Sequence, residues 1–454
     1  MRVTSAFCRL LRLEGVRVCG VEFLAGRIVV RVALRRQRLV CPLCAFSTMA
    51  SEGLQDHDSV WRHLDLGVWR LEVRAQLRQL RCPEHKVRVE GVPFARHPAG
   101  LTRDMDDLVA WLATKTDKTT ITRLVRVDWQ TVGRVVERVC ADELDDSRLE
   151  DLFDIGIDEI AWRGGHNYLT LVTDHRAGKV VWGGVGKSAK VADAFFADLD
   201  PGFDPDALEP EADVPPASSP ESIAVQGDDA PVAQDPVRRV APRAGRLEAI
   251  SLDMGPGYAK SAREHAPQAV ICIDPYHVVQ LANRALDEVR RSYWNQLRDA
   301  GQLLAAKRFK DARWALLKNP DDHTSTQAAT LRKLKNAGGD VWRAYTLKEA
   351  LRAIFVGGLT PLDVAALLDR FCSRAARSRL PAFVRLGETI RKHAASILAA
   401  IRTGINQGRV EALNNKARLI TRRAYGFHSP HAALALIHLT CGPITLTLPH
   451  EKSL

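Results

Sequence analysis

Two pairs of potential metal ligands constrain the N-terminal part of the chain more than any other feature of the sequence. The first pair is Cys41-Pro-Leu-Cys44 and the second is Cys82-Pro-Glu-His85. Two residues between the members of a pair allow one tight turn to aim both side chains at one ion, and Zn²⁺ accepts thiolate and imidazole together. We therefore expect a structural zinc site made by Cys41, Cys44, Cys82 and His85.

The surroundings of these pairs leave alternatives open. The paired cysteines could be core residues beside turns, and His57 and His63 are further candidate ligands. The gap between the pairs exceeds that of a short zinc finger, so each pair is expected to end a strand of a small ribbon. The remaining six cysteines stand singly within apolar stretches, which is typical of reduced, buried thiols.

Charge indicates the kind of partner. The chain has 454 residues, with 65 Lys and Arg against 54 Asp and Glu, for a net charge of +11. This excess favours a polyanion such as nucleic acid, although charge alone also allows a membrane surface. Without an apolar run long enough to span a bilayer or an N-terminal leader pattern, we expect a cytoplasmic protein that does not enter the membrane.

Residues 117–139 have the pattern of a helix-turn-helix unit. Two helical segments are separated by a tight turn at Val127 and Asp128, and the second opens near Trp129. Such units place the second helix in the major groove of DNA, with its first residues facing the bases. The residues expected to read bases are Gln130, Thr131 and Arg134. An ordinary helical hairpin is the alternative.

Arginines are also frequent between the two ligand pairs. Arg70, Arg74 and Arg78 recur at intervals of four residues. Guanidinium groups suit contacts with DNA phosphates, so we expect these three to bind DNA. A solvated basic face is the alternative.

Two strand-like segments carry an aspartate that strand formation does not favour. They are Ile155-Gly-Ile-Asp158 and Ile250-Ser-Leu-Asp253. In each, the apolar side chains alternate away from the aspartate, so neighbouring strands would bring both carboxylates to one side of a sheet. Close carboxylates repel, and a divalent cation such as Mg²⁺ relieves this repulsion.

A third carboxylate, Glu411, opens a predicted helix at residues 408–423. Glu411 lies opposite the apolar stripe of this helix, and Arg418 and Arg422 follow it at helical spacing, where they are expected to contact DNA phosphate. The stripe consists of Val410, Leu413, Ala417 and Ile420.

The choice of three carboxylates stays open on spacing alone. Glu159, Asp174 and Asp274 compete with Asp158, Asp253 and Glu411. For Asp274, which precedes Pro275 and a long predicted helix, a helix N-cap is a sufficient explanation.

Changes of pattern divide the chain into segments. We expect a zinc-binding domain (1–95), a helix-turn-helix region (96–150), an α/β core split between 151–202 and 246–291, a disordered acidic insert (203–245), a helical region (292–400) and a C-terminal helix with a tail (401–454).

An ordered series of phrases in this sequence resembles the DDE transposases of bacterial insertion sequences, specifically the ISL-three (ISL3) family. Besides the two ligand pairs, the resemblance rests on GIDEIAWRGGHNYLTLVTD, ISLDMGPGYAKSAREHAPQA, IDPYHVVQLANRALDEVRR and GRVEALNNKARLITRRAYGF, and it spans roughly residues 40–430. The sequence departs from the family at His85, where relatives often use cysteine, and in the acidic insert.

The resemblance implies a multidomain α/β protein. Its parts are a zinc ribbon, a helix-turn-helix unit and an RNase H-like mixed sheet with a large helical insertion, in which Asp158, Asp253 and Glu411 bind two Mg²⁺ or Mn²⁺ ions. It further implies an enzyme that cleaves and joins DNA at transposon ends and target sites, associated with the nucleoid and acting as a homodimer in a synaptic complex. Two alternatives are a catalytically inactive DNA-binding regulator and an RNase H-like nuclease without strand transfer.

Overall fold

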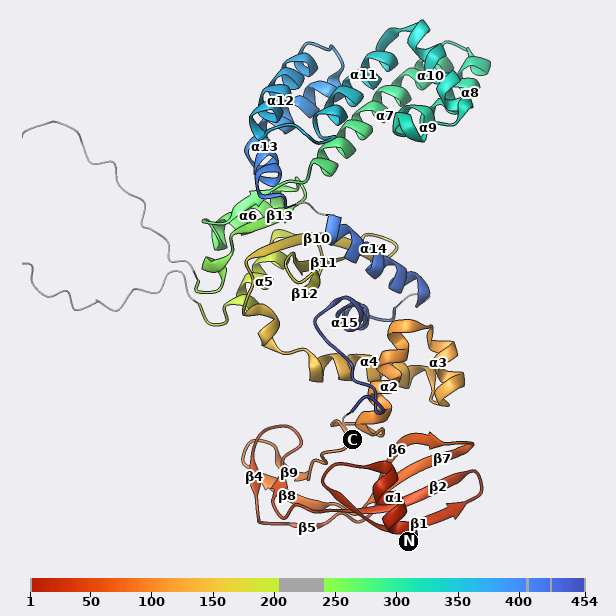
Figure 1. Cartoon of the computed structure of the whole chain (residues 1–454), viewed down its shortest axis with the longest axis vertical. Coiled ribbons are helices and arrows are strands. Elements are labelled where there is room, and N and C mark those ends of the chain that lie inside the picture. The colour runs from red at the N-terminus through yellow and green to blue at the C-terminus, as the bar shows by residue number, and fades with distance from the viewer. Residues whose placement is uncertain (1, 204–240, 406–407, 425–426, 453–454) are drawn as a thin grey trace, which may run out of the picture. The chain divides into compact units, whose positions relative to one another are not determined.

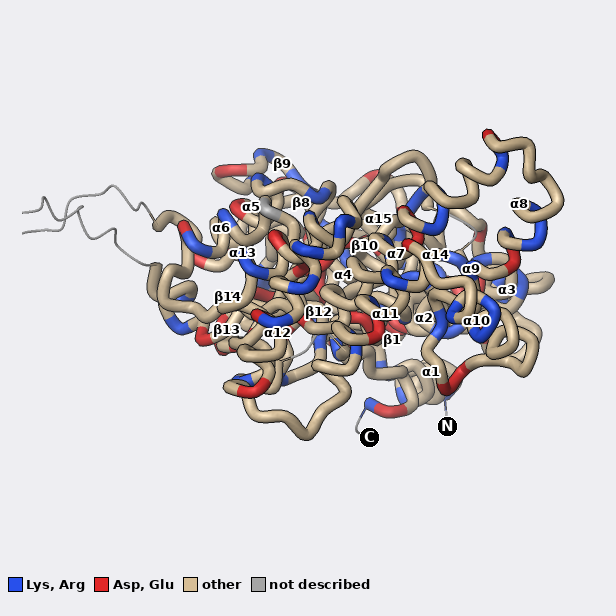
Figure 2. The backbone as a smooth tube through the Cα atoms, turned by 90° about the horizontal axis from the view of Figure 1, so that it is seen from above, with Lys and Arg blue, Asp and Glu red and all other residues tan. Residues whose placement is uncertain are grey.

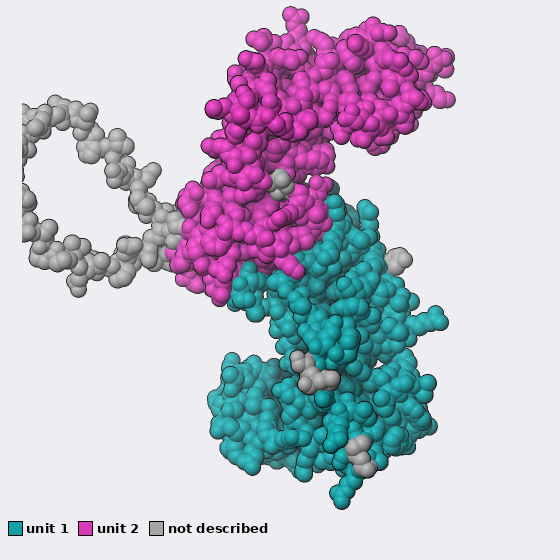
Figure 3. Space-filling view, in the orientation of Figure 1, with its two compact units in different colours: residues 1–148, 161–167, 415–454 teal, residues 149–160, 168–414 magenta. Residues whose placement is uncertain are grey.

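The computed structural model describes residues 2–203, 241–405, 408–424 and 427–452 (Figure 1). Residues 204–240, which make up most of the predicted acidic insert, lie outside the described residues. The chain divides into two compact units (Figure 3). Unit 1 comprises residues 1–148, 161–167 and 415–454, and unit 2 comprises residues 149–160 and 168–414. Within the described ranges, no helix is both long and apolar enough to cross a membrane.

The N-terminal part of unit 1 is a four-stranded sheet in the order β1-β2-β7-β6, with helix α1 (Val3–Leu11) packed against β1. Alternating apolar residues such as Val30 and Val73 are fully buried on one face and form a core with Trp61 and Phe94. The strands are β1 (Val16–Leu24), β2 (Arg27–Leu34), β6 (Ser59–Leu66) and β7 (Trp69–Ala75).

Two smaller sheets carry the paired ligands. Cys41 directly follows β3, and Cys82 is the last residue of β8, so both pairs lie where strands end. Leu39 and Leu80 are buried beside these cysteines in a core of their own. The predicted ribbon is therefore present. Its strands are β3 (Leu39–Val40) with β4 (Ser47–Thr48), and β5 (Gly53–Leu54) with β8 (Arg78–Cys82) and β9 (Lys86–Val89).

Helices α2 (Arg103–Lys115), α3 (Lys118–Val125) and α4 (Trp129–Glu143) follow in unit 1. The turn between α3 and α4 begins at Arg126, whose φ of 57° ends α3 in the left-handed region, and Asp128 caps α4 by accepting from the backbone N–H of Thr131. The predicted turn at Val127 and Asp128 and the start of the second helix at Trp129 are present in the structure.

The last helix, α15 (Pro430–Cys441), packs against α4 and α2. Almost all of its residues are buried, including the polar His438. The helix-turn-helix region is thus completed by a segment from the other end of the chain, which the sequence patterns did not indicate.

Unit 2 is built on a mixed five-stranded sheet in the order β12-β11-β10-β13-β14. Strands β13 and β14 continue the sheet parallel to β10, whereas β11 and β12 pair antiparallel. This is the RNase H-like arrangement expected from the resemblance. The strands are β10 (Asp154–Arg163), β11 (Asn167–Asp174), β12 (Lys179–Val185), β13 (Ala249–Leu252) and β14 (Val270–Cys272).

One face of this sheet is covered by helices α5 (Ala189–Leu199) and α6 (Pro256–His265). Ile155 and Ile157 point into the core on that face and are fully buried. The intervening Gly156 and the following Asp158 therefore belong to the opposite face. Strand β10 continues past Asp158 to Arg163, so this aspartate lies within the strand.

The remaining helices of unit 2 form one continuous core, which agrees with the expected helical region. Helix α13 packs against both α7 and β14, and so joins these helices to the sheet. The helices are α7 (Pro275–Asp299), α8 (Leu303–Lys310), α9 (Ala312–Leu317), α10 (Ser325–Ala337), α11 (Gly339–Ile354), α12 (Pro361–Ala376) and α13 (Pro381–Thr403). Helix α14 (Gly408–Arg423) follows them. Short 3₁₀ turns occur at Asp146–Leu149, Ala244–Arg246 and Pro320–Asp322.

Candidate functional site

The structure brings the four predicted zinc ligands together. Ligand atoms of Cys41, Cys44, Cys82 and His85 all lie within 4.8 Å of one another. The Sγ atoms of Cys44 and Cys82 are 3.7 Å apart, and His85 Nδ1 is 3.7 Å from Cys41 Sγ and 3.6 Å from Cys82 Sγ. A tetrahedral Zn²⁺ ion with bonds of about 2.1–2.3 Å separates its ligands by about 3.4–3.8 Å. The spacing of this cluster therefore fits zinc, with His85 in the fourth position.

The thiols of the cluster differ in pKa: burial and hydrogen bonds with Cys41 and Cys82 raise the pKa of Cys44 to about 11, whereas that of Cys82 is lowered. Burial raises the pKa of Cys82, but hydrogen bonds from the backbone and side chain of His85 and the backbone of Glu84 outweigh burial and lower the pKa to about 6. A thiolate is the form that binds metal. His57 and His63 are not in the cluster, and the buried His63 instead bonds the Thr102 hydroxyl through Nδ1 at 2.8 Å.

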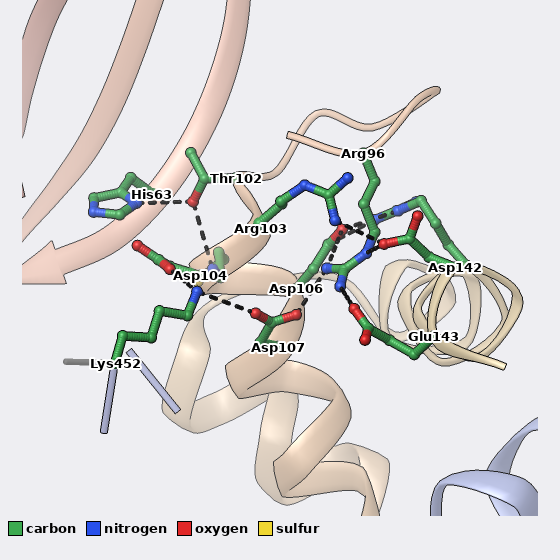
Figure 4. A network of polar contacts seen from close by, with 12 residues as sticks. His63, Arg96, Thr102, Arg103, Asp104, Asp106, Asp107, Asp142, Glu143 and Lys452 are labelled. Atoms are coloured by element: carbon green, nitrogen blue, oxygen red, sulfur yellow. Dashed lines mark hydrogen bonds and ion pairs between the residues drawn. The ribbon is translucent and has the colours of Figure 1, made fainter. Parts of the chain in front are cut away.

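A buried charge network lies where the chain leaves the ribbon and enters the helices (Figure 4). The Arg96 guanidinium is 3% exposed and donates to Asp107 of α2 at 2.8 Å and to Asp142 and Glu143 of α4 at 2.7 Å each. The fully buried Asp106 is held by Arg138 at 2.7 Å. One arginine thus ties α2 and α4 to the segment that follows the ribbon.

The three predicted base-reading residues occupy the first turns of α4. Gln130 and Arg134 are exposed. Thr131 donates its hydroxyl to the carboxylate of Asp128 and accepts from Arg134 Nη2 at 3.0 Å, so its side chain is already used in capping the helix. Gln130 and Arg134 are accordingly the better placed of the three to contact DNA.

The three predicted phosphate-binding arginines differ in their surroundings. Arg70 is exposed, whereas Arg74 donates to Glu72 at 2.8 Å. Arg78 is engaged on every nitrogen: it bonds both carboxylate oxygens of the buried Glu90 and the backbone carbonyls of residues 36 and 37. Arg78 therefore holds the ribbon together. Contact with DNA stays a prediction for all three arginines, and Arg70 and Arg74 have fewer bonds within the protein than Arg78 does.

Lys and Arg are not gathered in one block of the sequence. Figure 2 shows them along much of the backbone, interspersed with Asp and Glu. The net charge of +11 is therefore a property of many elements.

The sheet places two of the predicted catalytic aspartates at matching positions. In the parallel pair β10 and β13, Ile157 lies opposite Leu252, so that Asp158 and Asp253 each come one residue later on neighbouring strands. Neighbouring strands are about 4.8 Å apart. Glu159 lies close enough to both aspartates to be affected by their charges. Burial raises the pKa of Glu159, and the negative charges of Asp158 and Asp253 raise it further.

Helix α14 carries the third predicted carboxylate to this strand. Val410 packs over Gly156, where any Cβ would overlap its Cγ2 atom, and the Asn414 amide donates to Asp158 Oδ2 at 2.6 Å. Val410 and Asn414 are both buried and lie one helical turn apart. Glu411, which is half-buried, lies between them on the part of α14 that docks on β10.

Asn414 is a site residue that the sequence analysis missed. It is 1% exposed, and its Oδ1 atom has no hydrogen-bond partner in the part of the chain that the structure describes. Asn414 follows Val410 by four residues, so helical spacing places a polar residue on the buried stripe. This position could have identified Asn414 from the sequence, because buried polar groups need a hydrogen-bond partner. The stripe was predicted to contain Leu413, but Leu413 is only half-buried.

The competing carboxylates have other roles in the structure. Asp274 caps α7 by accepting from the backbone N–H of Tyr276 at 2.7 Å, as predicted. Asp174 accepts from the backbone N–H of Arg176. Among the described residues only the Cys41 cluster draws three or more ligand atoms within 4.8 Å, so Asp158, Asp253 and Glu411 are not gathered that tightly. Their joint role stays a prediction.

The basic residues of α14 continue beyond Glu411. Arg418 is half-buried and bonds Asn415 Oδ1 at 3.0 Å, and Arg422 is exposed. Both follow Glu411 along α14, as the predicted spacing requires.

Comparisons with known proteins agree with this architecture. A transposase model of the ISL3 family matches residues 155–209 and 228–437, and a model for the helix-turn-helix domain of transposase family ISL3 matches residues 90–140. The chain is 37% identical over 409 residues to the transposase for insertion sequence element IS1557 of Mycobacterium tuberculosis, covering 86% of this chain and 83% of that protein. It is 27% identical over 371 residues to the transposase for insertion sequence element IS1001 of Bordetella parapertussis, covering 81% and 80%.

The family models match most of the chain, on the segments that form the helix-turn-helix, the sheet and α14. This chain therefore belongs to the ISL3 family of DDE transposases.

Proposed function

We propose that this transposase binds the terminal inverted repeats of an insertion sequence and uses Asp158, Asp253 and Glu411 to cleave DNA and join it to a target. The observation that carries the proposal is the register of β10 and β13, which aligns the two aspartates, together with the docking of α14 on β10 beside Glu411. In this assignment Cys41, Cys44, Cys82 and His85 hold a structural zinc ion.

The donor set suits a hard divalent cation. Asp158, Asp253 and Glu411 offer only carboxylate oxygens, which Mg²⁺ and Mn²⁺ prefer. Two such ions, when bound, would lower the pKa of an attacking water and stabilise the charge on the leaving oxygen. The protein supplies the alignment: Asn414 orients the Asp158 carboxylate, and the parallel strands fix the separation of Asp158 and Asp253.

The reaction proceeds by two displacements at phosphorus. In the first, a water oxygen bonds to the phosphorus at the transposon end and the bond to the 3′-oxygen breaks, which leaves a free 3′-hydroxyl. In the second, this hydroxyl loses its proton and attacks a phosphorus of the target, which releases a target 3′-hydroxyl. The number of phosphodiester bonds is unchanged in the second step, so it needs no external energy source and no covalent protein intermediate.

Recognition precedes this chemistry. Gln130 and Arg134 at the start of α4 would contact base edges in the major groove, with Thr131 holding the helix start, and Arg70, Arg74, Arg418 and Arg422 would contact phosphates. Because two ends must be cut and joined together, we expect a homodimer or larger assembly on double-stranded DNA.

The test compares Asp158→Asn, Asp253→Asn and Glu411→Gln with Glu388→Gln, an exposed position on α13. In Mg²⁺, with duplexes carrying the flanking repeats of the element and a target plasmid, the first three variants should bind ends like the wild type but form no cleaved or joined product. Glu388→Gln should react like the wild type. Full activity in any of the three carboxylate variants would refute that assignment.

The same assay separates the alternatives. End binding by the wild type with no cleavage would indicate a DNA-binding regulator. Cleavage with no joined product would indicate a nuclease without strand transfer.

A further inference from the structure

Unit 2 contains a cavity that is separate from the predicted carboxylate site. It has a volume of about 760 Å³ and lies among α7, the segment that follows α9, the end of α11 and the end of α13. This volume is within the range of protein sites for small molecules. Its walls include Tyr276, Gln280 and Asn283 of α7, together with Lys318, Arg352 and Phe355.

The lining combines the three kinds of group that bind a nucleotide. Tyr276 is an aromatic residue that is 47% exposed. Gln280 and Asn283 are amides, which can pair with the edges of bases, and Lys318 is a cation, which suits phosphate. Arg352 also lines the cavity but donates to Glu349 at 2.7 Å, and the carboxylates of Asp274 and Asp322 belong to the same lining. Phe355, together with Ala400 and Ile401 near the end of α13, provides an apolar part of the lining.

Two details of this cavity concern hydrogen bonding. Gln280 Nε2 donates to Tyr276 Oη at 2.7 Å, which fixes the ring at the mouth of the cavity. Asn283 Oδ1 is buried and has no hydrogen-bond partner within the described ranges. A buried amide oxygen without a partner is costly, so a donor such as the exocyclic amine of a base would be stabilised there.

The cavity adjoins the carboxylate edge of the sheet. Ser251 of β13 lies opposite Cys272 of β14, and both strands end within one residue of this pair, shortly before Asp253 and before Asp274, which lines the cavity. The step between neighbouring strands is about 4.8 Å, and a DNA strand advances about 3.4 Å per nucleotide. A base a few nucleotides from a phosphate at Asp253 would therefore reach the cavity.

We propose that this cavity receives one nucleotide extruded from the bound DNA duplex near the cleaved phosphate, with its base stacked on Tyr276 and hydrogen-bonded by Asn283. The proposal rests on the proposed function, since it places the cleaved phosphate at Asp158 and Asp253. Extrusion costs stacking and pairing energy, which the aromatic and amide contacts offset. Holding one nucleotide outside the duplex fixes the DNA in register with the carboxylates.

The experiment uses the full-length Asp158→Asn variant, so that binding is observed without cleavage. Duplexes carrying the element's ends contain a single 2-aminopurine, moved one position at a time across the transposon boundary. We expect a severalfold change in fluorescence on binding at one position near the boundary. The added substitution Tyr276→Ala should abolish that change and, in the otherwise wild-type enzyme, slow cleavage about 5- to 100-fold, the range expected for loss of one base stack.

Tyr293→Ala is the matched control. Tyr293 lies on the same helix with a similar exposure of 39%, but packs against Phe309 away from the cavity. This variant should keep the fluorescence change and the cleavage rate. Asn283→Ala should reduce the change, and millimolar free deoxynucleotide should not compete for it.

Three results would overturn the proposal: no position with a distinct change, a change that survives Tyr276→Ala, or competition by free deoxynucleotide, which would make the cavity a mononucleotide site. These outcomes are independent of the proposed function. If the wild type cleaves and joins DNA but no nucleotide position is extruded, only the proposal for the cavity is contradicted. If a nucleotide is extruded but the wild type cleaves no DNA, only the enzymatic assignment is contradicted.

Discussion

Replacing Arg96 by methionine tests whether the buried charge network holds the helix-turn-helix region in place. Methionine keeps much of the length of the side chain but removes the guanidinium, which bonds Asp107, Asp142 and Glu143 at 2.7–2.8 Å (Figure 4). Asp107 is left in a largely buried position, with Lys452 at 3.4 Å as its remaining cation. Asp106, which is fully buried, keeps only Arg138.

The magnitude follows from the exposure of these partners. Removing one member of a buried ion pair costs about 3–5 kcal/mol. Asp142 and Glu143 are 36% and 39% exposed, so water can solvate their carboxylates once Arg96 is removed. These two ion pairs therefore contribute little to the loss in free energy of unfolding, and the lower end of the range applies. A loss of about 3 kcal/mol lowers the Tm of a unit of roughly 200 residues by about 6–12 °C.

Arg103→Met is the matched control. Arg103 is 40% exposed and makes a single ion pair, with Asp142 at 2.7 Å. Such a pair contributes about 0–1 kcal/mol, so the Tm should fall by less than about 4 °C. The measurement is differential scanning calorimetry of the full chain in zinc-containing buffer, following the transition of unit 1. If Arg96→Met melted no lower than Arg103→Met, the network would not stabilise this region as argued.

Three further predictions concern other parts of the molecule. Gly156→Ala should displace α14 together with Glu411, and should slow cleavage about 100-fold while end binding is retained. The control is Gly164→Ala, whose added Cβ meets no neighbouring atom within 4 Å and should leave the cleavage rate unchanged. Equal cleavage rates in the two variants would contradict the docking of α14 on β10. The purified chain should contain one zinc equivalent by mass spectrometry, and His85→Ala should lose it; zinc-free protein with a folded ribbon would exclude a structural metal. Hydrogen bonds from Thr131 lower the pKa of Asp128, so its stabilisation of α4 is complete above pH about 4 and is lost as the pH falls through that lowered pKa. Helicity between pH 2 and 5 should therefore fall more in the wild type than in Asp128→Asn, and identical profiles would show that the carboxylate does not act as a charged cap.

The sequence predicted those features that depend on local spacing. The two ligand pairs each fit one turn, and the alternation around Ile155 and Ile250 fixed which way the aspartates face. The turn at Val127 and Asp128 was predicted because the helical apolar pattern breaks there. Such signals lie within a few residues of each other, so no knowledge of distant contacts is needed.

Features that depend on distant partners were not predicted. The ion pair of Arg78 with Glu90 was not predicted, because no spacing rule connects the two residues, and contact of Arg78 with DNA stays a prediction. Asn414 was counted as one residue of a basic helix, and its bond to Asp158 depends on how α14 crosses the sheet.

The packing of α15 against α2 and α4 means that the DNA-reading part of this transposase is not a detachable cassette. A gene copy interrupted before Pro430 would encode a product that lacks α15, the helix that packs against α4 and α2. We expect residues 2–148 expressed alone to aggregate, and co-expression of residues 427–452 to restore a soluble complex.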